Sequence, residues 1–509
     1  ADAVRRARAI VEAGEGPVLL DCQCYRQSGH STSDTSSYRT REEVDAWRAV
    51  DPIKLFGDRL TETGVVDETG RRALETWAAD RVTEACRLAV DLEISARVDP
   101  RSDSRAISRF MFSGTEQALP EPGRARLARA LERSTRLAQI ATRDRRGIDE
   151  RGERVSSTKA VTLRVALFEA IVEHAVRDER LIIYGEENRD WEGAFGVYQG
   201  LTELLPYHRL FNAPISEAAI VGTAVGVAIE GGRALVELMY ADFIGRAGDE
   251  LFNQLAKWQA MSAGAVRMPV VVRASVGSKY GAQHSQDWTA LVAHVPGLKV
   301  VYPATPYDAK GLMASALSGD DPVVFFESQL LYDTAELFRP DGVPREYYRL
   351  PIGEPDVKRP GRDMTILTVG PALYRAMAAA DRLASEFSLE AEVIDARTLV
   401  PFDLEPLLES VRRTSRLVLV SDAVTRGSFL ATVAQQVGRL AFDHLDAPVV
   451  VLGAPNWITP PAELEEAFFP QSSDILDVIN AEIVPLTGYH GPTADELHAR
   501  AQEASRQGT

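Results

Sequence analysis

The chain has 509 residues, which is enough for roughly three domains of ordinary size. Its 45% hydrophobic and 26% charged residues are typical of a soluble globular protein with a large core. The formal charge of -17 argues against a general nucleic-acid or membrane-surface binder, because phosphate groups would be repelled. Three cysteines are too few for a disulfide scaffold or an iron–sulfur carrier. No signal peptide or membrane span is predicted, so we expect a cytoplasmic location.

The first hundred residues combine helical patterns with one polar loop. Residues 3–13 predict a helix, 18–20 a buried strand, and 42–96 a further set of helices. Between them, residues 21–39 are rich in serine, threonine and glycine and contain His30. Composition alone favours an ordinary surface loop at this place. The alternative is a loop that faces an anion or a cofactor, in which His30 handles protons near neutral pH.

Helices and strands alternate regularly after a charge-dense, turn-rich connector at 97–160. The predicted elements are helices at 163–177, 217–230, 246–263 and 306–318, and strands at 181–184, 234–239, 269–273, 298–302 and 322–326. Four shorter strands separated by helical patterns follow at 365–369, 391–395, 417–420 and 449–452. This alternation predicts a doubly wound α/β domain with parallel strands, followed by a smaller α/β domain.

Glu217 stands at the start of a helix built from small residues. An extended segment, 212–216, leads into it, and alanines and glycines follow up to Gly226. Alone, such a glutamate is usually just a charge favoured by the helix dipole. A second polar loop, 281–286, contains His284 and follows another predicted strand. Since ligands gather beyond strand ends in α/β sheets, we expect a cleft with a carboxylate and an imidazole, able to perform acid–base chemistry.

Several motifs resemble one family over more than half of the chain. The matching residues are Gly185-Glu186-Glu187, Pro214-Ile-Ser-Glu217, Gln283-His284-Ser285-Gln286, His294-Val-Pro296 and Asp395-Ala-Arg397. Residues 161–486 resemble the β subunit of thiamine-diphosphate-dependent 2-oxoacid dehydrogenases, of the pyruvate or branched-chain type. Residues 8–60 resemble the end of the α subunit, through Gly29-His30-Ser31 and Asp51-Pro52. The resemblance therefore implies a fusion of the C-terminal end of an α subunit with a complete β subunit.

The fold implied by this resemblance is the transketolase-like, thiamine-diphosphate-binding α/β fold, with doubly wound parallel sheets and a smaller C-terminal α/β domain. The expected organisation is an α-type part at 1–96, a connector at 97–160, a pyrimidine-binding domain at 161–345, a transketolase C-terminal-like domain at 346–490 and a tail at 491–509.

The resemblance also implies a role for individual residues. Glu217 falls where the family's glutamate hydrogen-bonds the aminopyrimidine ring, and Phe243 where an aromatic side chain packs on it; an ordinary core phenylalanine is the alternative. His284 and His30 occupy the positions of the two active-site histidines. The catalytic residues are thus expected to be Glu217, His284 and His30. The expected cofactor-binding residues are Glu217, Phe243, Ile215, Glu187, His30 and Ser31, and no residue is expected to bind a metal.

The implied reaction is oxidative decarboxylation of a 2-oxoacid with thiamine diphosphate and Mg²⁺, followed by reductive acylation of a lipoyl group. The implied partners are a lipoyl acyltransferase and, through it, dihydrolipoyl dehydrogenase, with a homodimer of the fused chain. The Gly-Asp-Gly motif that holds the diphosphate and Mg²⁺ in this family is absent from the sequence. We therefore expect that site outside these 509 residues. Two alternatives are a ketol or acyl transferase with a non-lipoyl acceptor, and a catalytically incomplete scaffold.

Overall fold

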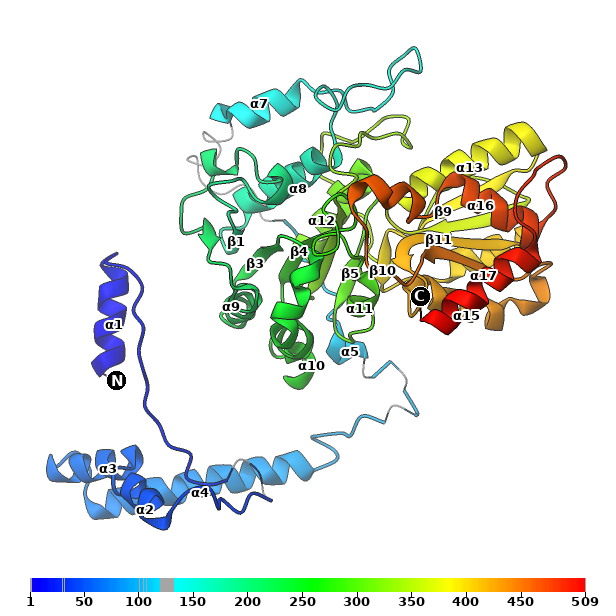
Figure 1. Cartoon of the computed structure of the whole chain (residues 1–509). Coiled ribbons are helices and arrows are strands. Elements are labelled where there is room, and N and C mark those ends of the chain that lie inside the picture. Colours follow the sequence, from blue (N-terminus) through cyan, green and yellow to red (C-terminus); the bar gives the residue numbers. More distant parts are fainter. Residues whose placement is uncertain are drawn as a thin grey trace. The chain divides into compact units, whose positions relative to one another are not determined.

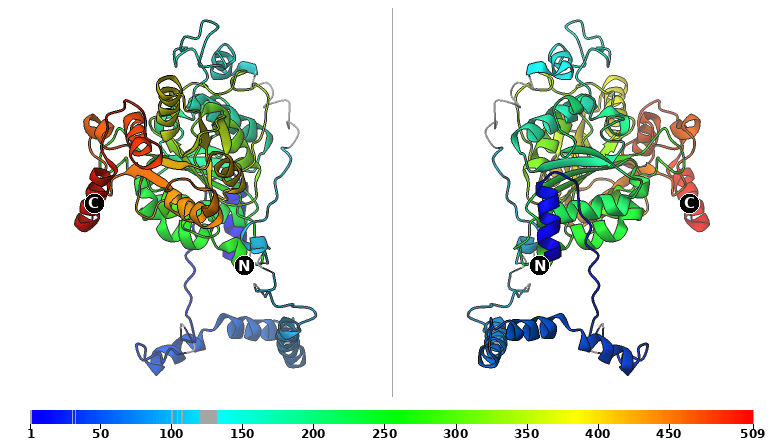
Figure 2. Two further views of the ribbon diagram at one scale, coloured as in Figure 1. Left: turned by 90° about the vertical axis from the view of Figure 1, so that its right-hand side faces the viewer. Right: turned by 90° about the vertical axis from the view of Figure 1, so that its left-hand side faces the viewer.

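The computed structural model of the chain (Figures 1 and 2) describes residues 2–29, 31, 33–99, 101–103, 105–106, 108–119 and 132–508. The chain divides into two compact units, Ala1–Asp99 and Pro100–Thr509. Each unit is described by itself. No helix in the described part of the chain is both long and apolar enough to cross a bilayer.

The N-terminal unit is helical, as predicted. Its helices are α1 (Asp2–Glu12), α2 (Arg41–Ala49), α3 (Pro52–Glu62) and α4 (Glu68–Val90). The carboxylate of Asp51 caps α3 by accepting from the backbone N–H of Ile53, with Pro52 at the first helical position. The predicted buried strand at 18–20 is wrong, because the segment pairs with no described strand and Leu19 is 94% exposed.

The larger unit begins with the described part of the segment 101–160, which contains α5 (Ser108–Met111) and α7 (Thr135–Ala141). Polar contacts tie this segment to the sheet domain that follows. The guanidinium of Arg145 binds both carboxylate oxygens of Glu169 at 2.7 and 2.8 Å. The backbone N–H of Ser113 donates to Asp321 at 2.6 Å.

A seven-stranded sheet forms the centre of the larger unit, in the order β10-β5-β6-β4-β3-β1-β2. Its strands are β1 (Leu181–Glu186), β2 (Leu210–Ala213), β3 (Arg233–Leu238), β4 (Val270–Val276), β5 (Lys299–Val301), β6 (Val323–Ser328) and β10 (Thr398–Val400). All neighbouring pairs are parallel except β10 with β5. Such a sheet needs apolar cover on both faces, which explains its valine-rich strands.

Helices supply that cover. α8 (Leu163–Arg177) and α12 (Pro306–Ser318) pack against each other and contribute to one hydrophobic core cluster. The buried residues of α9 (Glu217–Ile229) contribute to a second hydrophobic core cluster. The remaining helical segments of this domain are η1 (Ala194–Gly196), η2 (Leu201–Glu203), η3 (Ala241–Ala247), η4 (Glu250–Leu255), α10 (Trp258–Met261) and α11 (Thr289–Ala293). The single helix predicted at 246–263 is therefore wrong, since this stretch is divided into 3₁₀, π and α segments.

A second sheet has five strands in the order β12-β11-β8-β9-β7. Two of them, β9 and β11, are labelled in Figure 1. The strands are β7 (Asp356–Arg359), β8 (Met364–Thr368), β9 (Ala391–Asp395), β11 (Leu417–Val424) and β12 (Val450–Ala454). The helices are α13 (Ala372–Phe387), α14 (Glu405–Thr414), α15 (Phe429–Leu440), α16 (Ser472–Val478) and α17 (Ala494–Gln507), with shorter turns η5 (Phe442–His444), η6 (Ala462–Ala467) and η7 (Ile479–Ile483). Only β7 pairs antiparallel. The predicted fold class, parallel doubly wound sheets with a smaller C-terminal α/β domain, is confirmed.

Candidate functional site

Polar and aromatic residues lie at one edge of the large sheet, in the segments that follow five parallel strands. Glu187 follows β1, Glu217 follows β2, Phe243 follows β3, His284 follows β4 and Tyr332 follows β6. The carboxyl ends of parallel strands share an edge, so residues that are distant in the sequence meet there. The predicted β-type site residues thus lie along the place where α/β sheets bind ligands.

Glu217 is the first residue of α9 and is buried, with 7% of its surface exposed. No described residue donates a hydrogen bond to its carboxylate. The N-terminal end of the helix dipole favours its charge. Glu217 also influences the pKa of Glu186. Burial is the largest cause that raises this pKa, and the negative charges of Glu217, Glu237 and Glu187 raise it further. The carboxylate oxygens of Glu217 are not among the buried polar atoms, so they stay accessible and can accept a hydrogen bond from a ligand donor.

His284 lies among aromatic side chains. Its imidazole contacts Tyr240 with ring centroids 4.5 Å apart and meets Phe243 edge-on at 5.6 Å. Tyr240 in turn contacts Tyr280 at 5.9 Å and Phe195 at 6.1 Å. Two residues predicted for the site, His284 and Phe243, are therefore in direct contact, and the cluster around them forms an apolar wall.

Asp242 is a further acidic group near His284. One of its carboxylate oxygens accepts from the indole N–H of Trp288 at 3.2 Å, while the other is buried without a hydrogen-bond partner among the described residues. Burial raises the pKa of Asp242, and the charge of His284 is among the influences that lower it. Sequence reasoning missed Asp242 and Tyr240, although both lie within three residues of Phe243.

A buried ionic network supports this edge of the sheet from within. Arg273, almost completely buried, binds Glu327 through two nitrogens at 2.6 Å and Glu237 through the third at 2.5 Å. The Tyr332 hydroxyl donates to Glu327 at 2.7 Å, and the ring of Tyr332 stacks on Phe195 at 4.8 Å. The network therefore links the sheet interior to the aromatic wall, with its charges hydrogen-bonded.

The other predicted residues have different surroundings. Glu187 is exposed and has a positive φ of 53°, and Ile215 is 83% exposed. Ser31 belongs to the N-terminal unit, is exposed and lies 3.0 Å from the hydroxyl of Ser33. His30 lies outside the described residues. The structure therefore brings together His284 and Phe243 and places Glu217 on the same sheet edge.

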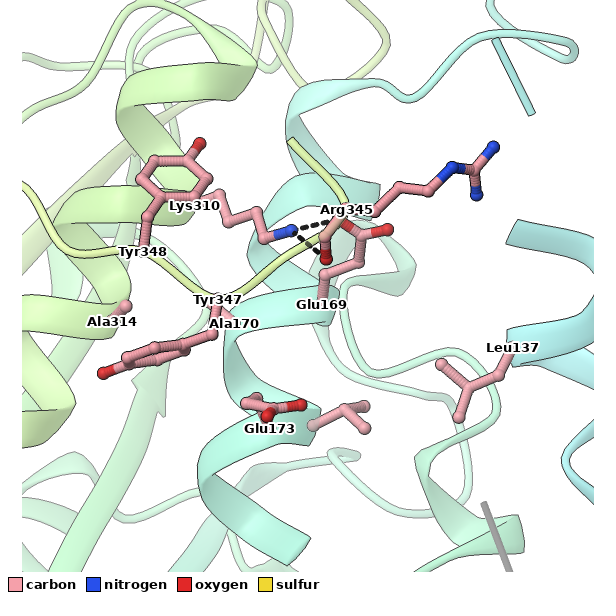
Figure 3. A pocket seen from close by; sticks show the side chains of 10 residues that line it. Leu137, Glu169, Ala170, Glu173, Lys310, Ala314, Arg345, Tyr347 and Tyr348 are labelled. Carbon is pink, nitrogen blue, oxygen red and sulfur yellow. Dashed lines mark hydrogen bonds and ion pairs between the residues drawn. The ribbon is translucent and has the colours of Figure 1, made fainter. Parts of the chain in front are cut away.

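A separate cavity of about 170 Å³ lies between α8, α12 and the segment 345–348 (Figure 3). The ammonium group of Lys310 points at Glu169, 2.9 Å away, and donates to the carbonyl oxygens of Pro344 and Arg345. Its charge is therefore already paired within the protein.

Three protein-family models match separate parts of the chain. Residues 1–95 match the family model "Dehydrogenase E1 component", residues 159–334 match "Transketolase, pyrimidine binding domain" and residues 353–475 match "Transketolase, C-terminal domain". A solved structure titled "Split gene transketolase, inactive beta4 tetramer" aligns with a TM-score of 0.52 and 24% identity, over 63% of this chain and 97% of that one. This likeness confirms the transketolase-like fold.

Two relatives cover the β-type region. The chain is 40% identical over 332 residues to the β subunit of acetoin:2,6-dichlorophenolindophenol oxidoreductase from Cupriavidus necator, covering 62% of this chain and 96% of that subunit. It is 38% identical over 322 residues to the pyruvate dehydrogenase E1 β subunit of Rickettsia conorii, covering 63% and 97%. An α-type segment precedes this region in the same chain. The chain therefore belongs to the E1 components of thiamine-dependent 2-oxoacid dehydrogenases, a family of oxidoreductases, as an α–β fusion.

Proposed function

We propose that the chain decarboxylates a 2-oxoacid with thiamine diphosphate and Mg²⁺ and passes the acyl group to a lipoyl group on an acyltransferase partner. The observation that carries the proposal is the carboxylate of Glu217, which stays accessible on a largely buried side chain and receives no hydrogen bond from the described residues. It begins α9 at the same sheet edge as Phe243 and His284. Dihydrolipoyl dehydrogenase would reoxidise the lipoyl group, and the fused chain would act as a homodimer.

The residues at this edge fit the aminopyrimidine part of the cofactor. Glu217 offers a carboxylate without a partner among the described residues to a ring nitrogen that needs a proton partner. Phe243 offers an aromatic face, and the exposed Ile215 and Glu187 lie where the neighbouring loops reach the edge. When bound, the cofactor supplies the carbon nucleophile and the electron sink of the decarboxylation. The protein holds it and governs its protonation.

His284 would handle the substrate. Its ring is fixed by Tyr240 and Phe243, so its nitrogens can orient the carboxylate of the oxoacid and transfer a proton when the acyl group leaves. We further propose that His30 is the second histidine and that Ser31, in the same hydroxyl-rich loop, contacts the cofactor. These two assignments rest on the motif Gly29-His30-Ser31.

The test is an assay of the purified chain with thiamine diphosphate, Mg²⁺ and a panel of 2-oxoacids, with a redox dye as acceptor and then with a lipoyl domain. The expected result is turnover that Glu217→Gln lowers by at least about 100-fold, since a lost positioned proton partner costs that much. Glu230→Gln, an exposed glutamate at the end of the same helix, is the matched control. Equal activity of Glu217→Gln and the parent chain would overturn the proposal.

Acetoin is a second candidate substrate, favoured by the 40% identity to an acetoin oxidoreductase β subunit. Acetoin carries no carboxylate, so His284 would have only proton transfer to perform. Comparing pyruvate with acetoin in the parent chain and in His284→Ala separates the two substrates.

The same assay identifies the acceptor of the acyl group. Turnover that requires the lipoyl domain supports the dehydrogenase, and turnover with an aldehyde or ketone acceptor supports a ketol or acyl transferase.

A further inference from the structure

The loop that carries His284 has a strained beginning. This segment, 277–286, follows β4 and is called the His284 loop below. Gly277, Ser278 and Lys279 have φ angles of 69°, 64° and 79°, so three consecutive residues adopt left-handed backbone conformations. Glycine adopts this conformation freely, but serine and lysine rarely do. Such a backbone persists only where its surroundings hold it.

Glu465 holds that strained beginning. The residue is half-buried on η6 of the C-terminal domain, and its two carboxylate oxygens each accept one hydrogen bond from the loop. The hydroxyl of Ser278 donates to one oxygen and the backbone N–H of Lys279 to the other, both at 2.5 Å. Hydrogen bonds to an ionised acceptor are about twice as strong as neutral ones. The pair therefore fixes both residues whose backbone is strained.

The same part of the C-terminal domain also holds the end of the loop. The hydroxyl of Thr459 lies 3.3 Å from the carbonyl oxygen of Ser285 and 3.1 Å from the side-chain oxygen of Gln286. His284 lies between these two attachments, and its own carbonyl oxygen accepts from Gln329 at 2.7 Å. The position of the imidazole thus depends on a domain that contributes no residue to the aromatic wall around it.

We infer that Glu465 is a positioning residue for catalysis, which acts by holding the His284 loop in the strained conformation that presents His284. The inference rests on the proposed function for its effect on turnover. Two neighbouring acids on η6, Glu463 and Glu466, are exposed. They share the charge of Glu465 but form no hydrogen bond or ion pair with the described residues of the loop. Replacing them therefore separates a general effect of acidity from the specific contact.

The first test does not require activity. Hydrogen–deuterium exchange of the full-length chain is compared for the parent, Glu465→Ala and the control Glu463→Ala. We expect the Lys279 amide to exchange at least about 10-fold faster in Glu465→Ala, because its acceptor is gone. The control is expected to match the parent. Unchanged exchange at Lys279 in Glu465→Ala overturns the inference, whether or not the chain turns over a 2-oxoacid.

The second test measures whether Glu465 acts through His284. We expect Glu465→Ala to lower kcat/KM by about 10–100-fold, mainly through kcat, since small displacements of a catalytic group have effects of this size. In the His284→Ala background the same change is expected to have no further effect, and additive losses overturn the inference. Glu465→Gln keeps one acceptor oxygen and is expected to be intermediate. If Glu465→Ala does not fold, Thr459→Val provides the same comparison at the other end of the loop.

Discussion

The imidazole of His284 packs against the ring of Tyr240, with centroids 4.5 Å apart and ring planes at 60°. Phe243 meets the same imidazole nearly at right angles. Aromatic contacts of this geometry restrict the orientation of a ring while leaving its nitrogens available. This arrangement suits the proton transfer that we propose for His284.

Tyr240 is therefore expected to matter through its ring. We predict that Tyr240→Phe keeps kcat/KM within about twofold of the parent chain and that Tyr240→Ala lowers it by about 10–100-fold, because the imidazole loses its orientation. Steady-state kinetics with the best 2-oxoacid checks this. Tyr207→Ala removes an exposed tyrosine beside β2 and serves as the control. A kcat/KM of Tyr240→Ala close to that of the parent would contradict the prediction.

Glu217 is expected to favour function at the expense of stability. Its carboxylate lies near Glu186, whose pKa it helps to raise. Glu217→Gln removes a like charge, so the pKa of Glu186 should fall and the free energy of unfolding should stay equal or rise by up to about 1 kcal/mol. Urea unfolding at pH 7 measures this change. A loss of more than about 1 kcal/mol would show that Glu217 mainly supports the fold.

Arg273 is expected to be essential for the stability of the large sheet. Replacing it with methionine leaves Glu237 and Glu327 buried without their cation. We predict a loss of about 3–5 kcal/mol in the free energy of unfolding. Arg382→Met is the matched control, because Arg382 pairs with Glu386 on the exposed face of α13 and such pairs contribute under about 1 kcal/mol. Losses of similar size in the two variants would be inconsistent with this account.

The stability of the chain should depend on pH through Asp395. Burial raises the pKa of Asp395 to about 7; Lys358 opposes this shift and the carboxylate of Asp308 adds to it. One carboxyl oxygen of Asp395 has no hydrogen-bond partner among the described residues. The folded chain therefore binds this proton more tightly than the unfolded chain, whose Asp has a pKa near 3.9. Its contribution to stability is complete below about pH 4 and is lost as the pH rises through about 7.

Asp395→Asn imitates the protonated carboxyl and tests this dependence. Near pH 4 the variant and the parent should have similar free energies of unfolding. By pH 8 the variant is expected to be more stable by about 2–4 kcal/mol. Chemical denaturation at three pH values between 4.5 and 8 gives the comparison, with the exposed Asp443→Asn as control. A difference that does not change with pH would count against the proposed ionisation.

Local sequence patterns predicted most of the secondary structure of the larger unit. The helix predicted at 163–177 is α8, and the strand predicted at 181–184 lies within β1. Glu217 begins its helix as expected. These predictions succeeded because apolar periodicity and capping residues report on neighbours within a few positions along the chain. The same patterns failed at 18–20, where an apolar run has no described neighbouring strand.

Only the tertiary structure decided which distant residues meet. β10 joins the edge of the large sheet although three strands, β7, β8 and β9, separate it from β6 in the sequence, and Glu465 contacts Ser278 across 187 positions. The contacts of His284 with Tyr240 and Phe243 likewise depend on the order of β3 and β4 in the sheet. Strand order and the packing of loops at its edge are set by the whole core, which no local pattern contains. The sequence therefore determined the kind of site, and the packing of two domains determined which residues hold it in place.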